Sequence, residues 1–221
     1  MKQLAPNVWQ LSVFPPNGIN VYMIEDVLID AASKWAKRRV MRQIDGKPLS
    51  MVALTHAHPD HQGVAKYVCE QRGVPLAVHE ADVPAMDGRE QLQSANPNHV
   101  MNRLSRAVFA GPPYKVERVL QDGDEVAGFK VVHAPGHTKG EVIFFRESDR
   151  VAIVGDVLAN MNVLTGRPGL HEMPGPYVVD VEQSRDSVRK LLDLQPALIC
   201  FGHGAPLRDL TKLERFVSEK I

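Results

Sequence analysis

The sequence is poor in cysteine, in aromatic residues and in charge of one sign. It holds two Cys among 221 residues, its aromatic content is 6%, and Lys plus Arg equal Asp plus Glu at 26 each. Cys69 and Cys200 both lie in apolar stretches, so we expect buried thiols rather than a disulfide. A formal net charge of zero provides no general attraction to nucleic acid or to an anionic membrane, and we expect neither as a partner.

Long hydrophobic runs are also lacking. No stretch approaches the roughly 18 apolar residues of a membrane span, and residues 1–7 lack the apolar core and cleavage site of a secretory signal. We therefore expect a cytoplasmic protein. A hydrophobic content of 44% and a charged content of 24% are typical of a globular chain that can bury a sizeable core. No linker or low-complexity tract divides it, so we predict a single domain over residues 1–221, without any indication of its oligomeric state.

Short apolar runs alternate with helix-like stretches, which predicts an α/β fold. We expect strands at residues 8–13, 20–24, 27–30, 51–54, 76–78, 116–120, 129–132, 142–145, 151–154 and 198–201. We expect helices at residues 33–44, from 63 to about 72, near 181–194 and from 209 onward. Ser33 is the expected N-cap of the first helix, with Trp35, Val40 and Ile44 among its apolar positions. Pro15-Pro16-Asn17-Gly18 separates the first two strands.

Two segments do not follow this alternation. Residues 80–115 contain helix-forming pieces at 80–93 and 98–109, which predict either a cover over one end of the core, forming part of a substrate pocket, or a helical surface insertion. Residues 159–177 are rich in Gly and Pro, which predicts a long loop. In this loop Met161, Asn162, His171 and Tyr177 are candidates to reach a substrate, with ordinary loop positions as the alternative.

The densest group of chemically reactive side chains is Thr55-His56-Ala57-His58-Pro59-Asp60-His61. Imidazole and carboxylate are ligands that suit zinc, iron and manganese. The apolar run 51–54 leads into the group and a helix-like stretch leads out. The group should therefore lie on a loop at the carboxyl end of a strand, where α/β scaffolds collect functional residues.

Three more ligand-type residues follow apolar strands in the same way. They are His137 in Ala-Pro-Gly-His-Thr, Asp156 in Val-Gly-Asp and His203 in Phe-Gly-His-Gly. Glycine beside each of them allows the backbone to approach closely. His79, His99 and His133 have no such setting, and we expect structural or exposed positions for them.

The pattern resembles the metallo-β-lactamase superfamily, whose signature is His-x-His-x-Asp-His followed by a distant His, Asp and His. The resemblance covers essentially the whole chain and implies a four-layer αββα sandwich with the metal site at one edge of its two sheets. It implies that His56, His58 and His137 bind one metal, that Asp60, His61 and His203 bind a second, and that Asp156 bridges the two. Asp30 resembles the family's Asp that supports a ligand, and Thr55 and Thr138 are further supporting candidates.

By the same resemblance the cofactor is two zinc ions, with iron or manganese as alternatives. A hydroxide that bridges the metals would be the nucleophile, and Asp60 would be the catalytic residue that orients it or passes its proton to the leaving group. The implied activity is hydrolysis of a small ester-like bond, namely a thioester, a lactone or an ester, in a small-molecule substrate.

Several branches of the superfamily differ from this chain. B1 β-lactamases carry Cys and B3 enzymes carry Ser where this chain has Asp156, and flavodiiron proteins carry Glu at the position of His58. Well-known lactonases carry Tyr at the position of Ala159. Glyoxalase II shares all seven ligands, but 18 residues follow His203 here and its C-terminal helical region is missing. The chain is thus glyoxalase II-like or lactonase-like rather than a typical B1 or B3 enzyme.

Other activities remain open at this stage. A mononuclear iron enzyme similar to persulfide dioxygenases would use His56, His137 and Asp156. Phosphoester hydrolysis or weak β-lactamase activity could use the same two-metal site. A non-catalytic binding module is disfavoured, because clustered polar groups are costly to bury without a metal.

Overall fold

The computed structural model describes residues 1–14, 17–94 and 96–221, so the predicted break at Pro15 and Pro16 lies outside the described residues. Over these ranges the strands form a seven-stranded sheet, a five-stranded sheet and a two-stranded hairpin. In the first sheet the strand order is β1 Lys2–Ala5, β2 Val8–Phe14, β3 Ile19–Ile24, β4 Val27–Ile29, β5 Met51–Ala53, β6 Leu76–His79 and β7 Arg118–Leu120. From β4 to β7 the strands are parallel.

The second sheet runs mostly antiparallel. Its order is β14 Leu198–Cys200, β11 Val151–Ile153, β10 Val142–Arg146, β9 Phe129–His133 and β8 Glu125–Val126. Only β11 and β14 pair in parallel among these strands. The helices are η1 Lys34–Ala36, α1 Lys37–Ile44, α2 Pro59–Gln62, α3 Ala65–Arg72, η2 Glu80–Asp82, α4 Val83–Met86, α5 Val100–Phe109, η3 Gly175–Tyr177, α6 Val181–Asp193 and α7 Leu210–Lys220.

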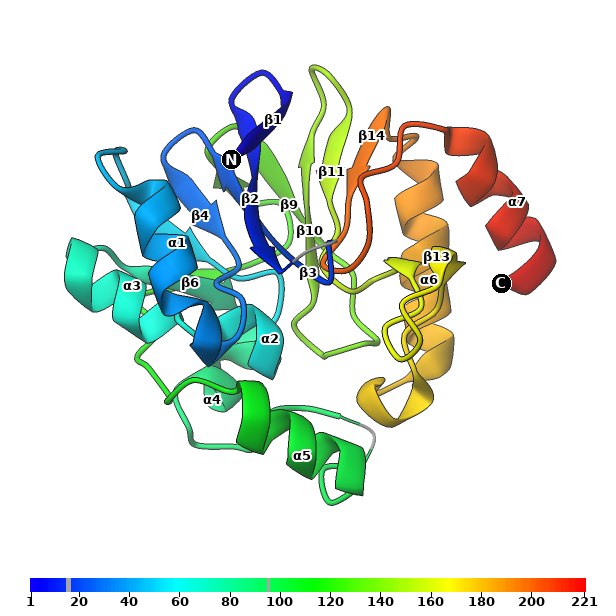
Figure 1. The fold of residues 1–221 in the computed structure, drawn as a ribbon. Helices are drawn as coiled ribbons and strands as arrows, with labels where there is room; N and C mark the ends of the chain where they lie inside the picture. Colours follow the sequence, from blue (N-terminus) through cyan, green and yellow to red (C-terminus); the bar gives the residue numbers. More distant parts are fainter. Residues whose placement is uncertain (15–16, 95) are drawn as a thin grey trace.

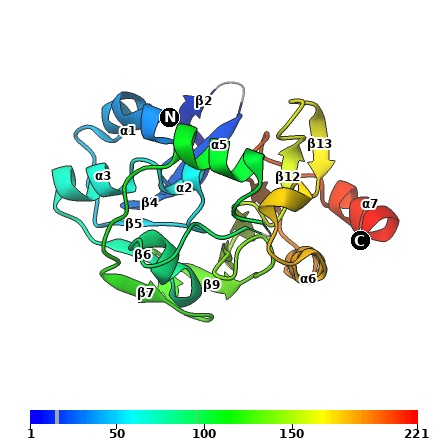
Figure 2. The same cartoon turned by 90° about the horizontal axis from the view of Figure 1, so that it is seen from below.

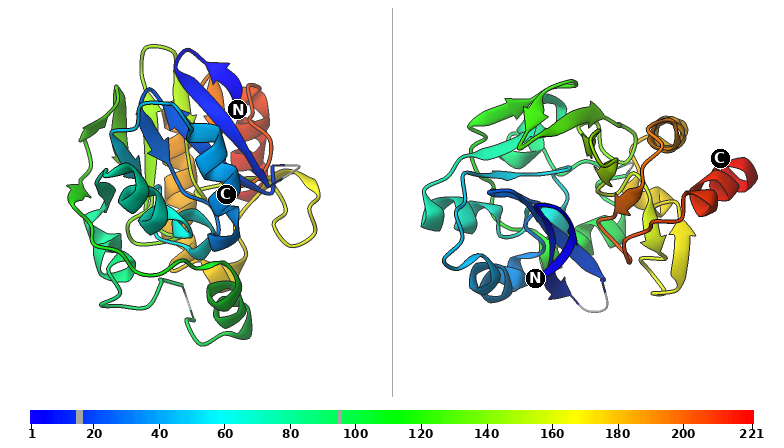
Figure 3. Two further views of the ribbon diagram at one scale, coloured as in Figure 1. Left: turned by 60° about the vertical axis from the view of Figure 1, so that its left-hand side comes forward. Right: turned by 90° about the horizontal axis from the view of Figure 1, so that it is seen from above.

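The two sheets pack face to face, with α1 and α3 outside the first and α6 and α7 outside the second (Figures 1 and 3). Successive side chains in a strand point to opposite faces, so each central strand contributes to two cores. In β10, Val142 and Phe144 pack between the sheets, whereas Ile143 and Phe145 pack toward α6 and α7. The predicted αββα sandwich is confirmed.

Both cysteines are free and buried, as predicted. Cys69 belongs to the core under α1 and α3, and Cys200 belongs to the core between the sheets. In the part of the chain that the structure describes, no helix is both long enough and apolar enough to cross a membrane.

Several predicted elements needed correction. Residues 80–93 hold only short helices, because η2 and α4 end by Met86, whereas the predicted helix at 98–109 is present as α5. The predicted loop 159–177 contains a hairpin of β12 Ala159–Met161 and β13 Pro168–His171. Trp35 is 68% exposed rather than a core position, and Ser33 precedes η1 without a capping hydrogen bond from its side chain. The strands β1 and β8 were not predicted.

The helix α5 and the β12–β13 hairpin lie at the same end of the sandwich (Figure 2). The segments that follow β5, β9, β11 and β14 carry the predicted metal ligands, and the residues that line one cavity join these segments to α5 and the hairpin. The prediction that residues 80–115 cover one end of the core is therefore correct for α5.

Candidate metal centre

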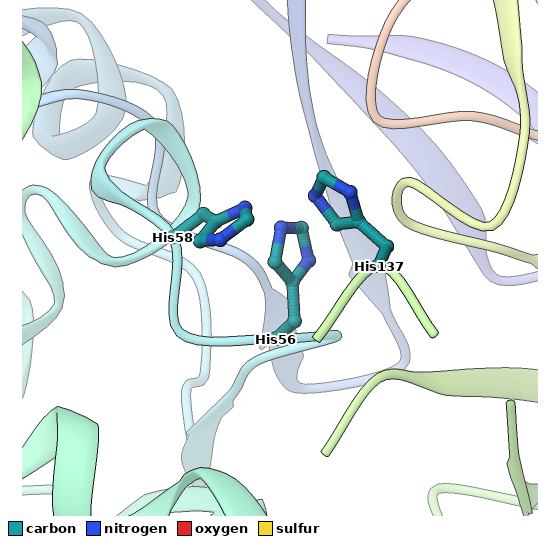
Figure 4. A group of neighbouring side chains, drawn as sticks. All are labelled: His56, His58 and His137. Carbon is teal, nitrogen blue, oxygen red and sulfur yellow. The ribbon is translucent and has the colours of Figure 1, made fainter. Parts of the chain in front are cut away.

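The first group of predicted ligands is His56, His58 and His137. The first two follow β5 and the third follows β9, and their rings point toward a common space (Figure 4). One ligand atom from each lies within 4.8 Å of the others. The ring centroids of His56 and His58 are 4.7 Å apart, and those of His58 and His137 are 4.4 Å apart. Rings held this close, with all three residues buried, form a cluster that can hold a metal ion.

The second group is Asp60, His61 and His203, whose ligand atoms also lie within 4.8 Å of one another. His203 Nε2 lies 3.3 Å from Asp60 Oδ2. Asp60 and His61 belong to α2, and His203 follows β14 in the other sheet. This second group therefore forms only when the two sheets pack together.

Asp156 lies between the two groups. Its Oδ1 is 3.5 Å from His61 Nε2, and its Oδ2 is 3.5 Å from His137 Nε2 and 3.3 Å from His203 Nε2. One carboxylate thus faces rings of both groups, which is the position that the resemblance implied for a bridging ligand.

Hydrogen bonds on the outer side of the rings determine which nitrogen faces inward. His58 Nε2 lies 2.6 Å from the carbonyl oxygen of Gln93, and His61 Nδ1 lies 2.9 Å from Asp30 Oδ2. His203 Nδ1 bonds to the carbonyl oxygen of Gly18. Because these oxygens accept, each bonded nitrogen must carry the proton. The lone pairs of His58 Nδ1, His61 Nε2 and His203 Nε2 are then free for a metal.

Four of the inward atoms lack a hydrogen-bond partner among the described residues. They are His56 Nε2, His61 Nε2, His137 Nε2 and Asp156 Oδ1, and all are buried. A buried polar atom without a partner costs on the order of 1–3 kcal/mol, so four at one place call for a ligand that accepts lone pairs. Nitrogen and carboxylate donors in this ratio fit zinc, iron or manganese. The donor set therefore fits two divalent cations.

The electrostatics divide the rings into two kinds. Burial lowers the pKa of His56 and of His137 well below the usual value, and neighbouring imidazoles add to the effect. Burial also disfavours charge on His61, but Asp156 and Asp30 raise its pKa well above the usual value. For His203, burial is outweighed by Asp156 and Asp60, which raise the pKa to about 10. His61 and His203, which each face two carboxylates, thus attract positive charge most strongly.

Asp30 supports the centre through hydrogen bonds to His61 and Thr55. Besides His61, its carboxylate accepts hydrogen bonds from Thr55 N at 2.8 Å and from Thr55 Oγ1 at 2.9 Å. Asp30 has a φ of 63°, in the left-handed region that non-glycine residues rarely adopt. Strain of this kind is typical of functional sites. The structure thus brings two of the three predicted supporting residues, Asp30 and Thr55, to the ligands.

Two buried carboxylates at the centre, Asp82 and Glu141, were not predicted from the sequence. Asp82 accepts from Ala57 N at 2.9 Å, from Thr138 Oγ1 at 3.0 Å and from Gly140 N at 2.8 Å. Asp82 therefore connects the His56–His58 loop to the loop of His137. Thr138 supports the centre through its hydrogen bond to Asp82. Asp82 follows β6 as the ligands follow their strands, so the same rule applied to residues 76–82 would have found it.

Glu141 is the second missed carboxylate. Its Oε1 accepts from Asp156 N at 2.8 Å and lies 3.4 Å from His56 Nδ1. Burial, followed by the charge of Asp156, raises the pKa of Glu141 well above its usual value. An acidic residue that opens the apolar strand 142–145 is the signal that could have found it, because the start of antiparallel β10 lies beside the end of β9.

Two glycines permit the close packing of this centre. A Cβ at Gly202 would clash with Asp156 Oδ1 and with the ring of His61. A Cβ at Gly155, which has a φ of 51°, would clash with Glu141 Oε1 and Thr55 Oγ1. The glycines next to Asp156 and His203 therefore provide space for the side chains of the centre.

The remaining histidines take structural positions, as predicted. His79 Nδ1 accepts from Ala81 N and His99 Nδ1 accepts from Met101 N, each at a helix start. The ring of His133 stacks on that of His79, with centroids 4.1 Å apart.

A cavity of about 280 Å³ opens onto the centre. Met161 and Tyr177 line it, in agreement with the prediction that this segment reaches the site. His171 and Asn162 are not among the lining residues. His171 pairs with Ala159 in the hairpin, and Asn162 Oδ1 accepts hydrogen bonds from Leu164 N and Thr165 N. These two are therefore ordinary loop and strand positions.

Known proteins resemble this chain in sequence and in fold. A family model described as the metallo-beta-lactamase superfamily matches residues 14–203. YflN of Bacillus subtilis, named as a probable metallo-hydrolase, is 27% identical over 90% of this chain and 88% of its own length. A solved structure of TTHA1623 in a di-iron-bound form is 28% identical, with a TM-score of 0.69 over 93% of this chain and 96% of that one. The B3 metallo-β-lactamase BJP-1 of Bradyrhizobium japonicum shares the fold, with a TM-score of 0.72 over 98% of this chain and 89% of that one at 21% identity.

Proposed function

The chain belongs to the metallo-β-lactamase superfamily, and from this premise we propose that it is a two-metal hydrolase of a small ester-like bond: a thioester, a lactone or an ester. The observation that carries the proposal is the set of inward lone pairs, of which four belong to buried atoms without a hydrogen-bond partner among the described residues. Such a set is costly to bury unless cations fill it.

His56, His58 and His137 would hold the first cation, and Asp60, His61 and His203 would hold the second. Asp156 would be shared by both, because its two oxygens face rings of the two groups. When bound, the pair of cations would lower the pKa of water toward about 7 and polarise an oxygen of the substrate.

Asp60 is the catalytic side chain in this proposal. It is the most exposed of the seven ligand-type residues, with 23% of its side chain accessible, and it lines the cavity. Its carboxylate can orient a water molecule, accept the proton and return it to the leaving oxygen or sulfur. The other six residues are at most 6% exposed, so they bind and exclude bulk water.

The buried carboxylates orient the ligands. Asp30 holds His61 in the tautomer that presents Nε2, and Glu141 lies next to both His56 and the backbone of Asp156. Such partners usually raise the metal affinity of the ring they hold.

Zinc is the proposed metal because imidazole-rich sites suit it. Iron is the alternative, supported by the di-iron form of TTHA1623. BJP-1 resembles this chain in fold alone. B3 enzymes carry Ser where this chain has Asp156, so we propose a substrate other than a β-lactam.

Metal analysis of purified protein, combined with a panel of thioesters, lactones, esters, phosphoesters and a chromogenic β-lactam, tests the proposal. We expect about two metals per chain and hydrolysis of at least one ester-like class that a chelator abolishes. Fewer than one metal per chain in active protein would disprove the two-metal site. Oxygen consumption with a glutathione persulfide, dependent on a single iron, would instead favour the mononuclear oxygenase.

A further inference from the structure

The cavity above the metal centre has mainly apolar walls. Its apolar lining includes Phe109 at the end of α5, and Met161, Leu164 and Met173 from the segment that contains the hairpin. Ile19 and Leu92 add to this apolar lining. Ligands of the proposed metals also line the cavity, so a bound molecule meets both the metal centre and apolar side chains.

The walls offer little that could recognise a charged group. Apart from the metal-centre residues, Arg106 is the one charged side chain among the described residues that line the cavity. Arg106 Nη2 already donates to the carbonyl oxygen of Pro97. A carboxylate or phosphate in this cavity would find Arg106 as its one counter-charge among these wall residues, and away from Arg106 it would lose its hydration without compensation, which is unfavourable.

Some of the uncharged polar groups of the walls already make hydrogen bonds. Gln93 donates to Ala81 O and accepts from Lys139 N, and Asn102 donates to Asn96 O and Pro176 O. Asn102 Oδ1 and Ser94 Oγ are buried without a partner among the described residues. These two oxygens can hydrogen-bond to one neutral polar group of a bound substrate, but neither carries a charge that would attract an ion.

We propose that the substrate is an acyl compound whose uncharged, apolar acyl group fills this cavity while its ester-like bond lies at the metal centre. The inference rests on the proposed function and specifies its substrate class. Water adds to the acyl carbon, the bond from that carbon to the leaving oxygen or sulfur breaks, and the proton passes to the leaving group. The products are a free carboxylic acid and an alcohol or a thiol.

A series of aryl esters from acetyl to decanoyl tests this assignment. Burial of each added methylene contributes up to about fourfold to kcat/KM, so we expect a steep rise that levels off once the cavity is filled. An ester of equal length that ends in a carboxylate should be hydrolysed much more slowly. A flat profile, or a preference for the carboxylate-ended chain, would overturn the proposal.

Matched variants localise the effect. Leu164 lines the cavity and is 59% exposed, whereas Leu104 is 63% exposed on α5 and is not a lining residue. Leu164→Gln should lower kcat/KM about threefold for the longest ester and leave the acetyl ester unchanged. Leu104→Gln should leave the whole profile unchanged. Equal effects of the two variants would contradict the placement of the acyl group.

A filling variant tests the same point from the opposite direction. Ser105 lines the cavity from α5, and Ser105→Phe should shift the plateau to shorter esters. An unchanged plateau would contradict the assignment.

A binding experiment separates this inference from the proposed hydrolysis. Alkyl methyl ketones cannot be hydrolysed, and their displacement of the neutral dye Nile red from the holoprotein should strengthen with chain length. Length-dependent displacement without any ester hydrolysis would refute the proposed reaction and retain the acyl site. Ester hydrolysis without length dependence in either experiment would refute the acyl site and retain the reaction.

Discussion

The metal centre and the α5–hairpin walls are built very differently. The residues of the centre are mostly buried. Carboxylates or carbonyl oxygens hold each ligand ring or the residue next to it in the chain, as Asp30 holds His61. In α5 only Asn102 is buried. The helix is tied to the rest of the chain by bonds such as Lys34 Nζ to Ala107 O and Trp35 Nε1 to Val108 O.

This difference indicates that the centre determines the reaction, whereas the walls determine which substrate is selected. Catalytic geometry tolerates little displacement, so the centre is assembled from strand ends that the two packed sheets hold rigidly. The walls only need to match the shape and polarity of a substrate, and a partly exposed helix and hairpin can change without disturbing the ligands. Changes in the centre should therefore alter metal content, whereas changes in the walls should alter substrate preference alone.

The largest effect is expected for Asp156→Ala. Loss of the shared carboxylate should reduce occupancy of both metals and lower kcat/KM by at least about a thousandfold, equivalent to about 4 kcal/mol. Metal analysis and steady-state kinetics on the same preparation check this. Asp149→Ala is the control and should keep both metals. Asp149 pairs with Arg146 and lies in the turn between β10 and β11. Full metal content in Asp156→Ala would show that the ligand assignment is wrong.

His203→Ala should empty one of the two proposed metal sites and leave the other filled. Only the group of Asp60 and His61 loses a ligand, so about one metal per chain should remain and activity should fall by about a hundredfold. His58→Ala should empty the other site, which titration with a spectroscopically visible metal such as cobalt would distinguish. Identical spectra for the two half-loaded variants would contradict the division into two groups.

Glu141→Gln tests whether a carboxylate that is not a ligand still belongs to the centre. The amide keeps the size of the side chain but replaces one of the two carboxyl oxygens next to His56 and Asp156 with an NH2 group. Metal affinity should fall about 10- to 100-fold, measured by competition with a chelator. Asp30→Asn should weaken metal binding similarly through His61. The exposed Glu117→Gln is the control, and an affinity for Glu141→Gln equal to that control would remove Glu141 from the centre.

Trp35→Phe should give the smallest effect and should be confined to the wall. It removes the hydrogen bond to Val108 O, worth about 1 kcal/mol. Hydrogen exchange in α5 should accelerate and KM for a long ester should rise a few-fold, while metal content and kcat stay unchanged. A matched Trp9→Phe variant, on β2, should leave α5 exchange unaltered. A loss of metal in Trp35→Phe would show that wall and centre are not independent.

Much of the fold was readable because strand and helix periods are local properties. The runs at 142–145, 151–154 and 198–201 alternate between two apolar faces, and the structure confirms strands there. The short strands β1 and β8 and the hairpin in 159–177 were missed, because their pairing depends on partners rather than on their own pattern. Trp35 was misassigned because hydrophobicity alone does not show that its indole N–H bonds to α5.

The sequence by itself determined which side chains can bind metal and that they follow strands, because the motif His56 to His61 and the Gly-flanked His137, Asp156 and His203 are local patterns. Only the tertiary structure decided which ring nitrogens face inward, that Asp82 and Glu141 join the centre, and that α5 and the hairpin enclose an apolar cavity. These features depend on contacts between residues as far apart as Gly18 and His203, which form only when the two sheets pack. Local patterns carry no information about such contacts, because packing across the sheets sets the distances.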